Sequence, residues 1–133
     1  MSSFHLSIVT PDGRYFDGEA ERLTVRTTNG GVTILPRHIN YVAALGMGTA
    51  TVVTNGETKK AACIGGMLSV MYGKVKVIAT TFEWADEIDR ARAEQALARA
   101  EQKLADEALS KEQRAPYEAA RRRALVRLST ANQ

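Results

Sequence analysis

The residue pattern of this chain changes once, at Glu83-Trp84-Ala85-Asp86. Before this point, apolar and polar residues alternate in short runs that are separated by glycine, proline and asparagine, which is typical of β-strands joined by tight turns. After it, alanine, leucine, glutamate, glutamine and arginine dominate, and these residues favour helices. The chain is therefore expected to be an α+β protein with its strands first, divided into residues 1–84 and 85–133.

Hairpin signals recur through the first part. Residues 4–10 alternate and end at the turn sequence Pro11-Asp12-Gly13. Asn55-Gly56, the strongest short hairpin signal, separates two further runs. Gly65-Gly66 marks a bend or a close approach of backbones. The expected strands are 4–10, 23–27, 32–35, 49–54, 58–64, 67–72 and 74–80. Short strands without intervening helices predict an antiparallel β-sandwich or flattened barrel.

The second part predicts two helices. Asp86 is the expected N-cap of the first, which would run over 87–108. A connection near Ser110 follows, and Pro116 is expected in the first turn of the second helix, which would end near Leu128. The expected apolar stripes are Ile88, Ala91, Leu97, Ala100 and Leu104 on the first helix, and Tyr117, Ala120, Ala124, Leu125 and Leu128 on the second.

These stripes are thin, because alanine buries little apolar surface. We therefore expect an antiparallel two-helix hairpin that is only loosely held, on a firmer β-domain.

Charge and composition exclude several classes of protein. The net charge is +3, with both signs dense in the helical part and Arg121-Arg122-Arg123 near its end. No apolar run reaches membrane-spanning length, and the N-terminus does not resemble a signal peptide. Two distant histidines and the lone Cys63 offer no metal site and no catalytic arrangement. The sequence therefore predicts neither an enzyme nor a metal protein.

Helical spacing places Asp89, Arg92 and Arg99 on one face of the first helix, beside Ala93 and Ala96. An aspartate and an arginine three residues apart usually form a solvated ion pair. The same groups around a shallow alanine patch could instead hold a flat polyanion, because guanidinium groups bind phosphate in a bidentate manner.

Three segments carry a resemblance to a known family. Ile8 to Gly13, Ile34 to Ile39 and Gly65 to Val70 occur in the order and spacing seen in the ε subunits of bacterial F-type ATP synthases. The chain is similar to that family along its whole length. The resemblance implies a non-catalytic rotor subunit of the central stalk that couples ion translocation to ATP synthesis.

Some members of that family bind ATP through an Ile/Leu-Asp-x-x-Arg-Ala motif, which resembles residues 88–93 here. The resemblance implies that Ile88, Asp89 and Ala93 face the adenine and that Glu83 lies near the ribose. Arg92 and Arg99 would meet the phosphates. The second helix would add Arg123 and Arg127, with Arg122 as an adjacent alternative. ATP would be a regulatory ligand, bound with or without Mg²⁺, and the hairpin would extend and inhibit ATP hydrolysis when ATP is absent.

The resemblance also implies the partners. The γ subunit and the c-ring would contact the β-domain, including Arg37 and His38, and the α and β catalytic subunits would contact the extended hairpin. The expected location is the cytoplasmic face of the bacterial cell membrane, held by the complex without lipid insertion. Arg37 replaces the glycine that relatives usually have, and Pro116 is expected to shorten the second helix. An alternative function is a small adaptor whose Arg-rich helix binds nucleic acid or an acidic protein, although the nearly balanced charge argues against nucleic acid.

Overall fold

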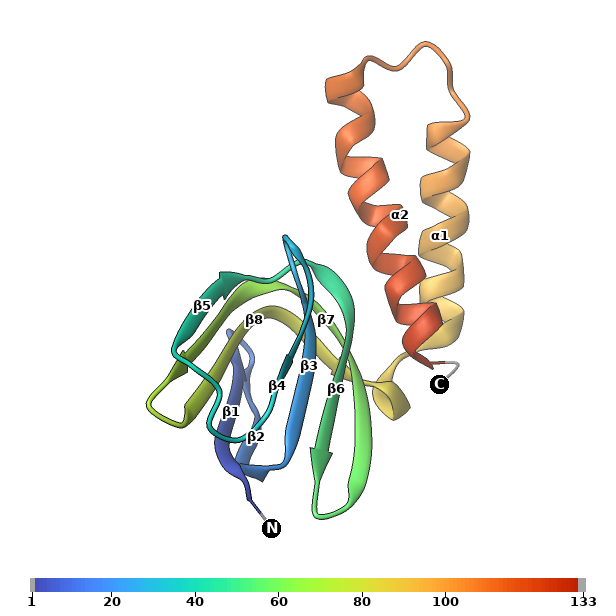
Figure 1. Cartoon of the computed structure of the whole chain (residues 1–133). Helices are drawn as coiled ribbons and strands as arrows, with labels where there is room; N and C mark the ends of the chain where they lie inside the picture. The colour runs from blue at the N-terminus through green and yellow to red at the C-terminus, as the bar shows by residue number, and fades with distance from the viewer. Residues whose placement is uncertain (1, 132–133) are drawn as a thin grey trace.

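The computed structural model describes residues 2–131 and consists of a β-sandwich followed by a helical hairpin that projects from one end of it (Figure 1). The strands are β1 (Phe4–Thr10), β2 (Gly13–Ala20), β3 (Arg22–Thr27), β4 (Gly30–Ile34), β5 (Tyr41–Ala44), β6 (Met47–Thr54), β7 (Glu57–Met71) and β8 (Lys74–Trp84). A short 3₁₀ turn, η1 (Ala85–Glu87), leads to helices α1 (Arg90–Leu104) and α2 (Lys111–Ala131). The expected α+β architecture is confirmed.

The strands form one unclosed sheet in the order β2-β1-β8-β7-β6-β3-β4, and β5 pairs with β7. All pairs are antiparallel except β1 and β8, which run parallel. Hairpin patterns predict antiparallel neighbours only, so this parallel pair between the first and last strands was not foreseen. It follows from folding the sheet over itself, which brings the two ends of the β-domain together.

Strand β7 is longer than expected, because the predicted strands 58–64 and 67–72 are continuous. Its first half pairs with β6 and its second half with β5. Between these halves lie Gly65 and Gly66, both with positive φ. A Cβ atom on Gly66 would lie 2.0 Å from the Ile78 carbonyl oxygen, so the expected close backbone approach is present. The glycines let a single strand bend across both layers of the sandwich.

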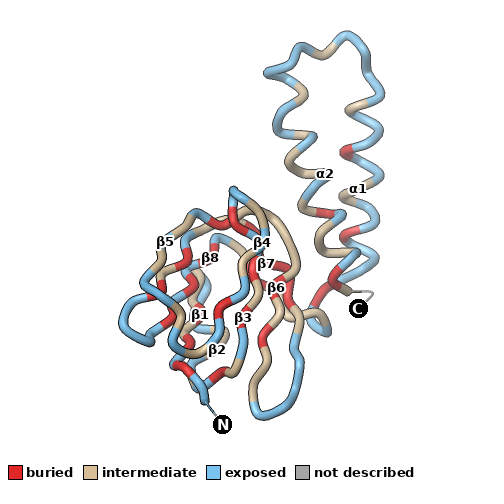
Figure 2. The backbone as a smooth tube through the Cα atoms, in the orientation of Figure 1, coloured by how far each residue is buried: buried red, intermediate tan, exposed pale blue. Residues whose placement is uncertain are grey.

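The hydrophobic core lies between the layers of the sandwich and is made of alternate strand residues, as Figure 2 shows. Leu6, Leu23, Val52 and Leu68 are fully buried there. The hairpin buries far less. The buried apolar residues of the two helices are Ala93, Ala100 and Ala124, so alanine supplies the fully buried apolar surface of the hairpin. Ala91 and Leu125 are expected in these stripes but are exposed, because the buried face of α1 runs through Ala93 and Ala100 and that of α2 through Ala124.

Both helix starts differ from the predictions. Asp86 lies in the 3₁₀ turn, and Asp89 is the N-cap of α1, so the helix is shorter than the expected 87–108. Helix α2 begins at Lys111, because Ser110 and Gln113 form a reciprocal capping box with bonds of 3.1 and 2.8 Å. Pro116 therefore lies inside the helix rather than in its first turn. It removes one N–H donor without shortening α2.

Candidate functional site

A pocket of about 800 Å³ lies at the junction of the hairpin and the sandwich. Its volume is within the range of small-molecule sites. The start of α1, the end of α2, the end of β8 and the turn between β1 and β2 supply its walls. The lining residues are Asp12, Tyr15, Thr81, Phe82, Glu83, Glu87, Asp89, Arg92, Ala93, Gln95, Ala96, Arg99 and Arg127.

Asp89 is fixed by its position at the helix start. Its Oδ1 accepts a hydrogen bond from the Arg92 backbone N–H at 3.0 Å, which satisfies one of the free donors of the first turn. This cap orients the carboxylate and sets the direction of α1. The second carboxylate oxygen remains available as an acceptor, and both Asp89 and Arg92 line the pocket.

Glu83 and Arg127 form an ion pair across the junction. Arg127 Nε donates to Glu83 Oε1 at 2.6 Å, and both side chains are about two-thirds to three-quarters shielded from solvent. These residues are far apart in sequence, on β8 and α2. Their contact ties the end of α2 to the sandwich and holds the Arg127 guanidinium at the edge of the pocket.

Most of the residues predicted for the ATP site come together in this pocket. Those lining it are Glu83, Asp89, Arg92, Ala93, Arg99 and Arg127. Ile88 and Arg123 are not among the lining residues. Ile88 is buried, and its neighbours Glu87 and Asp89 line the pocket. Arg123 is half-buried one helical turn before Arg127. The fold thus brings residues of both helices and of β8 to one place.

The charges of the pocket suit a ligand with an anionic part and a polar planar part. Arg92, Arg99 and Arg127 offer guanidinium groups, which bind phosphate or carboxylate in a bidentate manner. Asp89 and Glu87 offer carboxylate acceptors for an amino or hydroxyl group. The apolar surface between them comes from alanines and aromatic rings.

Among the lining residues that were not predicted for this site, Asp12 and Tyr15 come from the most distant part of the sequence. They lie at the β1–β2 turn, far from the helices in sequence. The turn itself is visible in the sequence as Pro11-Asp12-Gly13. Its position beside the hairpin depends on the packing of the sandwich, so no local signal could have indicated it.

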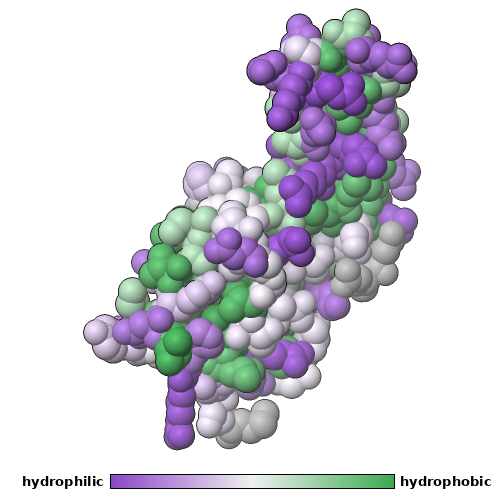
Figure 3. Space-filling view, turned by 45° about the horizontal axis from the view of Figure 1, so that its top comes forward, coloured by the Kyte–Doolittle hydropathy of each residue, from purple (hydrophilic) through white to green (hydrophobic). Residues whose placement is uncertain are grey.

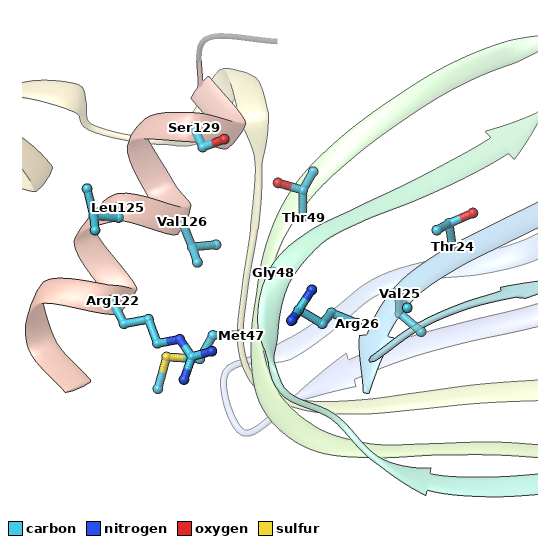
Figure 4. A pocket seen from close by; sticks show the side chains of 11 residues that line it. Thr24, Val25, Arg26, Met47, Gly48, Thr49, Arg122, Leu125, Val126 and Ser129 are labelled. Atoms are coloured by element: carbon cyan, nitrogen blue, oxygen red, sulfur yellow. The ribbon is translucent and has the colours of Figure 1, made fainter. Parts of the chain in front are cut away.

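A second cavity, of about 480 Å³, lies on the opposite side of α2, between that helix and strands β3 and β6. In Figure 4 the Arg122 side chain of α2 reaches toward Met47, and Arg26 extends from β3 on the other side of Gly48. Arg122 therefore faces this cavity rather than the predicted ATP site. The arginines of α2 point in different directions, whereas a nucleic-acid interface would gather them on one face.

The segment around Arg37 and His38 is a tight turn at the other end of the sandwich. The His38 N–H donates to the Leu35 carbonyl oxygen at 3.1 Å, and Arg37 has a φ of 67° after Pro36. These features match a type II turn, which favours glycine at the Arg37 position. Leu35 and Ile39 beside it are 52% and 77% exposed. The apolar surface of this loop is of the kind that partner proteins cover.

Hydrophilic side chains dominate the end of the hairpin away from the sandwich, whereas hydrophobic surface gathers nearer the junction (Figure 3). Over residues 2–131, no cluster of three potential metal ligands is present. No helix in the same range is long and apolar enough to cross a membrane. Burial raises the pKa of the Cys63 thiol from 9.0 to about 12, so this thiol stays protonated and unreactive.

Comparison with known proteins matches both parts of the chain to family models. Residues 3–85 match the β-sandwich domain of the ATP synthase Delta/Epsilon chain. Residues 86–132 match its long alpha-helix domain.

Curated relatives extend over nearly the whole chain. The ATP synthase epsilon chain of Caldanaerobacter subterraneus subsp. tengcongensis is 37% identical over 131 residues, covering 98% of this chain and 94% of the relative. The ATP synthase epsilon chain of Ruminococcus albus is 38% identical, covering 99% of this chain and 98% of the relative. Among solved structures, a chain of the Euglena gracilis mitochondrial ATP synthase has the same fold, with a TM-score of 0.85 at 22% identity. The match covers 100% of this chain and 83% of that one.

Proposed function

This chain belongs to the ATP synthase Delta/Epsilon family as an epsilon-type, non-catalytic subunit, and from that membership we propose that it is an ATP-responsive regulator of its complex. The β-sandwich would join the central stalk to the c-ring and so couple ion translocation to ATP synthesis. The hairpin would bind ATP while folded against the sandwich. Without ATP it would extend toward the α and β catalytic subunits and slow ATP hydrolysis.

The contact with the γ subunit and the c-ring is proposed for the far end of the sandwich. Arg37 and His38 lie there, next to the exposed Leu35 and Ile39. Exposure of these apolar side chains to water is unfavourable, and a partner protein that covers them would remove this penalty. The complex would hold the chain on the cytoplasmic face of the bacterial membrane as a peripheral protein.

The observation that carries the nucleotide proposal is the convergence of Arg92, Arg99 and Arg127 with Asp89 on one pocket. These groups come from both helices, and they meet only while α1 and α2 lie antiparallel and the end of α2 is docked. A ligand that bridges them must therefore favour the folded hairpin over any open form. This is the linkage that a regulatory switch requires.

Isothermal titration of the purified chain with ATP, with and without Mg²⁺, tests the proposal directly. Charge-assisted hydrogen bonds contribute roughly 1.5–3 kcal/mol each, so Arg92→Ala should weaken ATP binding at least about tenfold. Arg90→Ala is a matched control, because Arg90 lies in the same turn of α1 but outside the pocket. Equal ATP affinity in the Arg92 and Arg90 variants would show that the motif is only a solvated ion pair on the surface.

Asp89 needs a different variant, because Asp89→Ala would also remove the helix cap. Asp89→Asn keeps a good N-cap but presents an amide donor where the carboxylate would accept from the adenine amino group. We expect Asp89→Asn to weaken ATP binding and to reduce the preference for ATP over GTP. An unchanged preference would show that Asp89 caps the helix without reading the base.

A further inference from the structure

The junction pocket has a second wall that the helices do not supply. Tyr15 of β2 and Asp12 of the β1–β2 turn line it from the sandwich side, and Ala93 and Ala96 line it from α1. A ligand held by the helix residues therefore lies against a residue of the sandwich as well.

Tyr15 reaches the pocket because β2 contains a β-bulge. Ile8 pairs with Phe16 and Val9 pairs with Arg14, which leaves Tyr15 as the extra residue. In a regular strand, neighbouring side chains point to opposite faces, but here both Tyr15 and Phe16 pack against the core. Bulges commonly re-aim a side chain beside a binding site.

The ring of Tyr15 is held firmly. It packs edge-to-face on Phe82 with ring centroids 5.6 Å apart and an interplanar angle of 62°. Phe82 is buried and packs in turn on Trp84, at 5.0 Å and 90°. Tyr15 itself is only half-buried. The Tyr15 ring is therefore held in place by Phe82 and is accessible from the pocket.

We propose that Tyr15 is a base-contacting residue of the nucleotide site, and that its ring stacks with the planar base while the arginines hold the phosphates. This inference rests on the proposed function and adds a sandwich residue to a site otherwise built around the hairpin. The pocket offers the planar apolar surface and the cationic groups that a nucleotide combines. A base stacked on Tyr15 would link the hairpin to the sandwich through the ligand. Inorganic polyphosphate could not form this link, because it has no base.

Titration of the full chain with ATP and, separately, with inorganic tripolyphosphate tests this assignment. Stacking of a base on an aromatic side chain is worth roughly 1–3 kcal/mol, so Tyr15→Leu should weaken ATP binding at least about fivefold. Tripolyphosphate binding should change less than about twofold, because it uses the arginines alone. Tyr15→Phe keeps the ring and should bind ATP like the unsubstituted chain.

A second measurement needs no substitution. In the chain labelled at its tyrosine rings, the Tyr15 resonances should shift with ATP, through the ring current of the base, and should stay in place with tripolyphosphate. Unchanged ATP affinity in Tyr15→Leu, equal weakening of both ligands, or an unshifted Tyr15 signal would each overturn the inference. Failure of the unsubstituted chain to bind ATP at all would instead overturn the proposed function.

Discussion

At Gly66, two backbones of the sandwich approach each other closely. This residue has a φ of 115°, and a Cβ atom there would lie 2.0 Å from the Ile78 carbonyl oxygen and 2.8 Å from the Ala79 Cα atom. Both neighbours are backbone atoms, which cannot move aside without breaking the pairing of β7 with β8. Glycine is therefore required at position 66 for two reasons: there is no room for a Cβ atom, and the backbone has a positive φ.

We expect Gly66→Ala to lower the free energy of unfolding by more than about 3 kcal/mol, because it adds both strain and a clash. Gly56→Ala is the matched control: Gly56 also has positive φ, at 76°, but a Cβ atom there would meet nothing within 4 Å. Gly56→Ala should lower the free energy of unfolding by only about 1 kcal/mol. Urea unfolding of both variants gives the comparison, and similar losses at the two sites would contradict the clash.

Cys63 makes stability depend on pH in the alkaline range. Because burial raises the pKa of its thiol from 9.0 to about 12, the unfolded chain loses this proton at lower pH than the folded chain does. The contribution of Cys63 to the free energy of unfolding is therefore constant below pH 9. It falls as the pH rises toward 12, by up to about 4 kcal/mol.

Cys63→Ala should remove this part of the pH dependence, since other titrating groups are common to both chains. Chemical unfolding of the two chains between pH 8 and the alkaline limit measures the difference. The native thiol should also resist thiol reagents at pH 8 until the chain unfolds. Rapid labelling of the native protein would show that the thiol is accessible.

At the scale of the elements, the end of α2 is attached to the sandwich more specifically than the two helices are to each other. Thr130 is fully buried, and its hydroxyl donates to the Val126 carbonyl oxygen at 2.7 Å. A hydroxyl has one proton, so the Thr49 hydroxyl of β6 must donate to Thr130 Oγ1, at 2.8 Å. Together with the ion pair of Arg127 and Glu83, this bond fixes the hairpin at its base.

Thr130→Val should loosen the last two turns of α2 while preserving the volume of the side chain. Loss of the hydrogen bonds is worth about 1–2 kcal/mol, so amide hydrogen exchange in those turns should speed up about five- to thirtyfold. Thr49→Val combined with Thr130→Val should be less than additive, because both remove the same bond. Thr33→Val, which breaks the exposed pair with Thr24 on β4 and β3, should leave exchange in α2 unchanged.

For the whole molecule, the sandwich and the hairpin differ in how much they depend on each other. The sandwich has a continuous core and strands that pair among themselves, whereas the hairpin has an alanine seam and a few polar contacts at its base. The balance between docked and open hairpin can therefore lie within the few kcal/mol that one bound ligand supplies.

A chain truncated after Trp84 should retain the β-sandwich, as measured by cooperative thermal unfolding, and should still join the stalk. If the hairpin is a brake, the complex that carries the truncated chain should hydrolyse ATP at least as fast as the full-length complex at low ATP concentration. Slower hydrolysis by a fully assembled truncated complex would show that the hairpin is not a brake.

Features that depend on neighbouring residues can be predicted from the amino-acid sequence. Asn55-Gly56 turns with φ values of 52° and 76°, as a tight hairpin requires, and the change of composition after Trp84 separates strands from helices. The helical spacing that put Asp89, Arg92 and Arg99 on one side also holds, because it is fixed by the geometry of the helix. The choice between two nearby caps is less well determined by the local sequence, because Asp86 and Asp89 are both good N-caps and it is Asp89 that begins α1.

Contacts between distant residues depend instead on the packing of the whole fold. Three contacts each join segments far apart in the chain: the parallel pairing of β1 with β8, the ion pair between Glu83 and Arg127, and the pocket that Tyr15 and α1 line together. Such contacts form because the sandwich must bury its apolar faces together. The path that achieves this depends on the packing of the whole domain, which no local run of residues encodes.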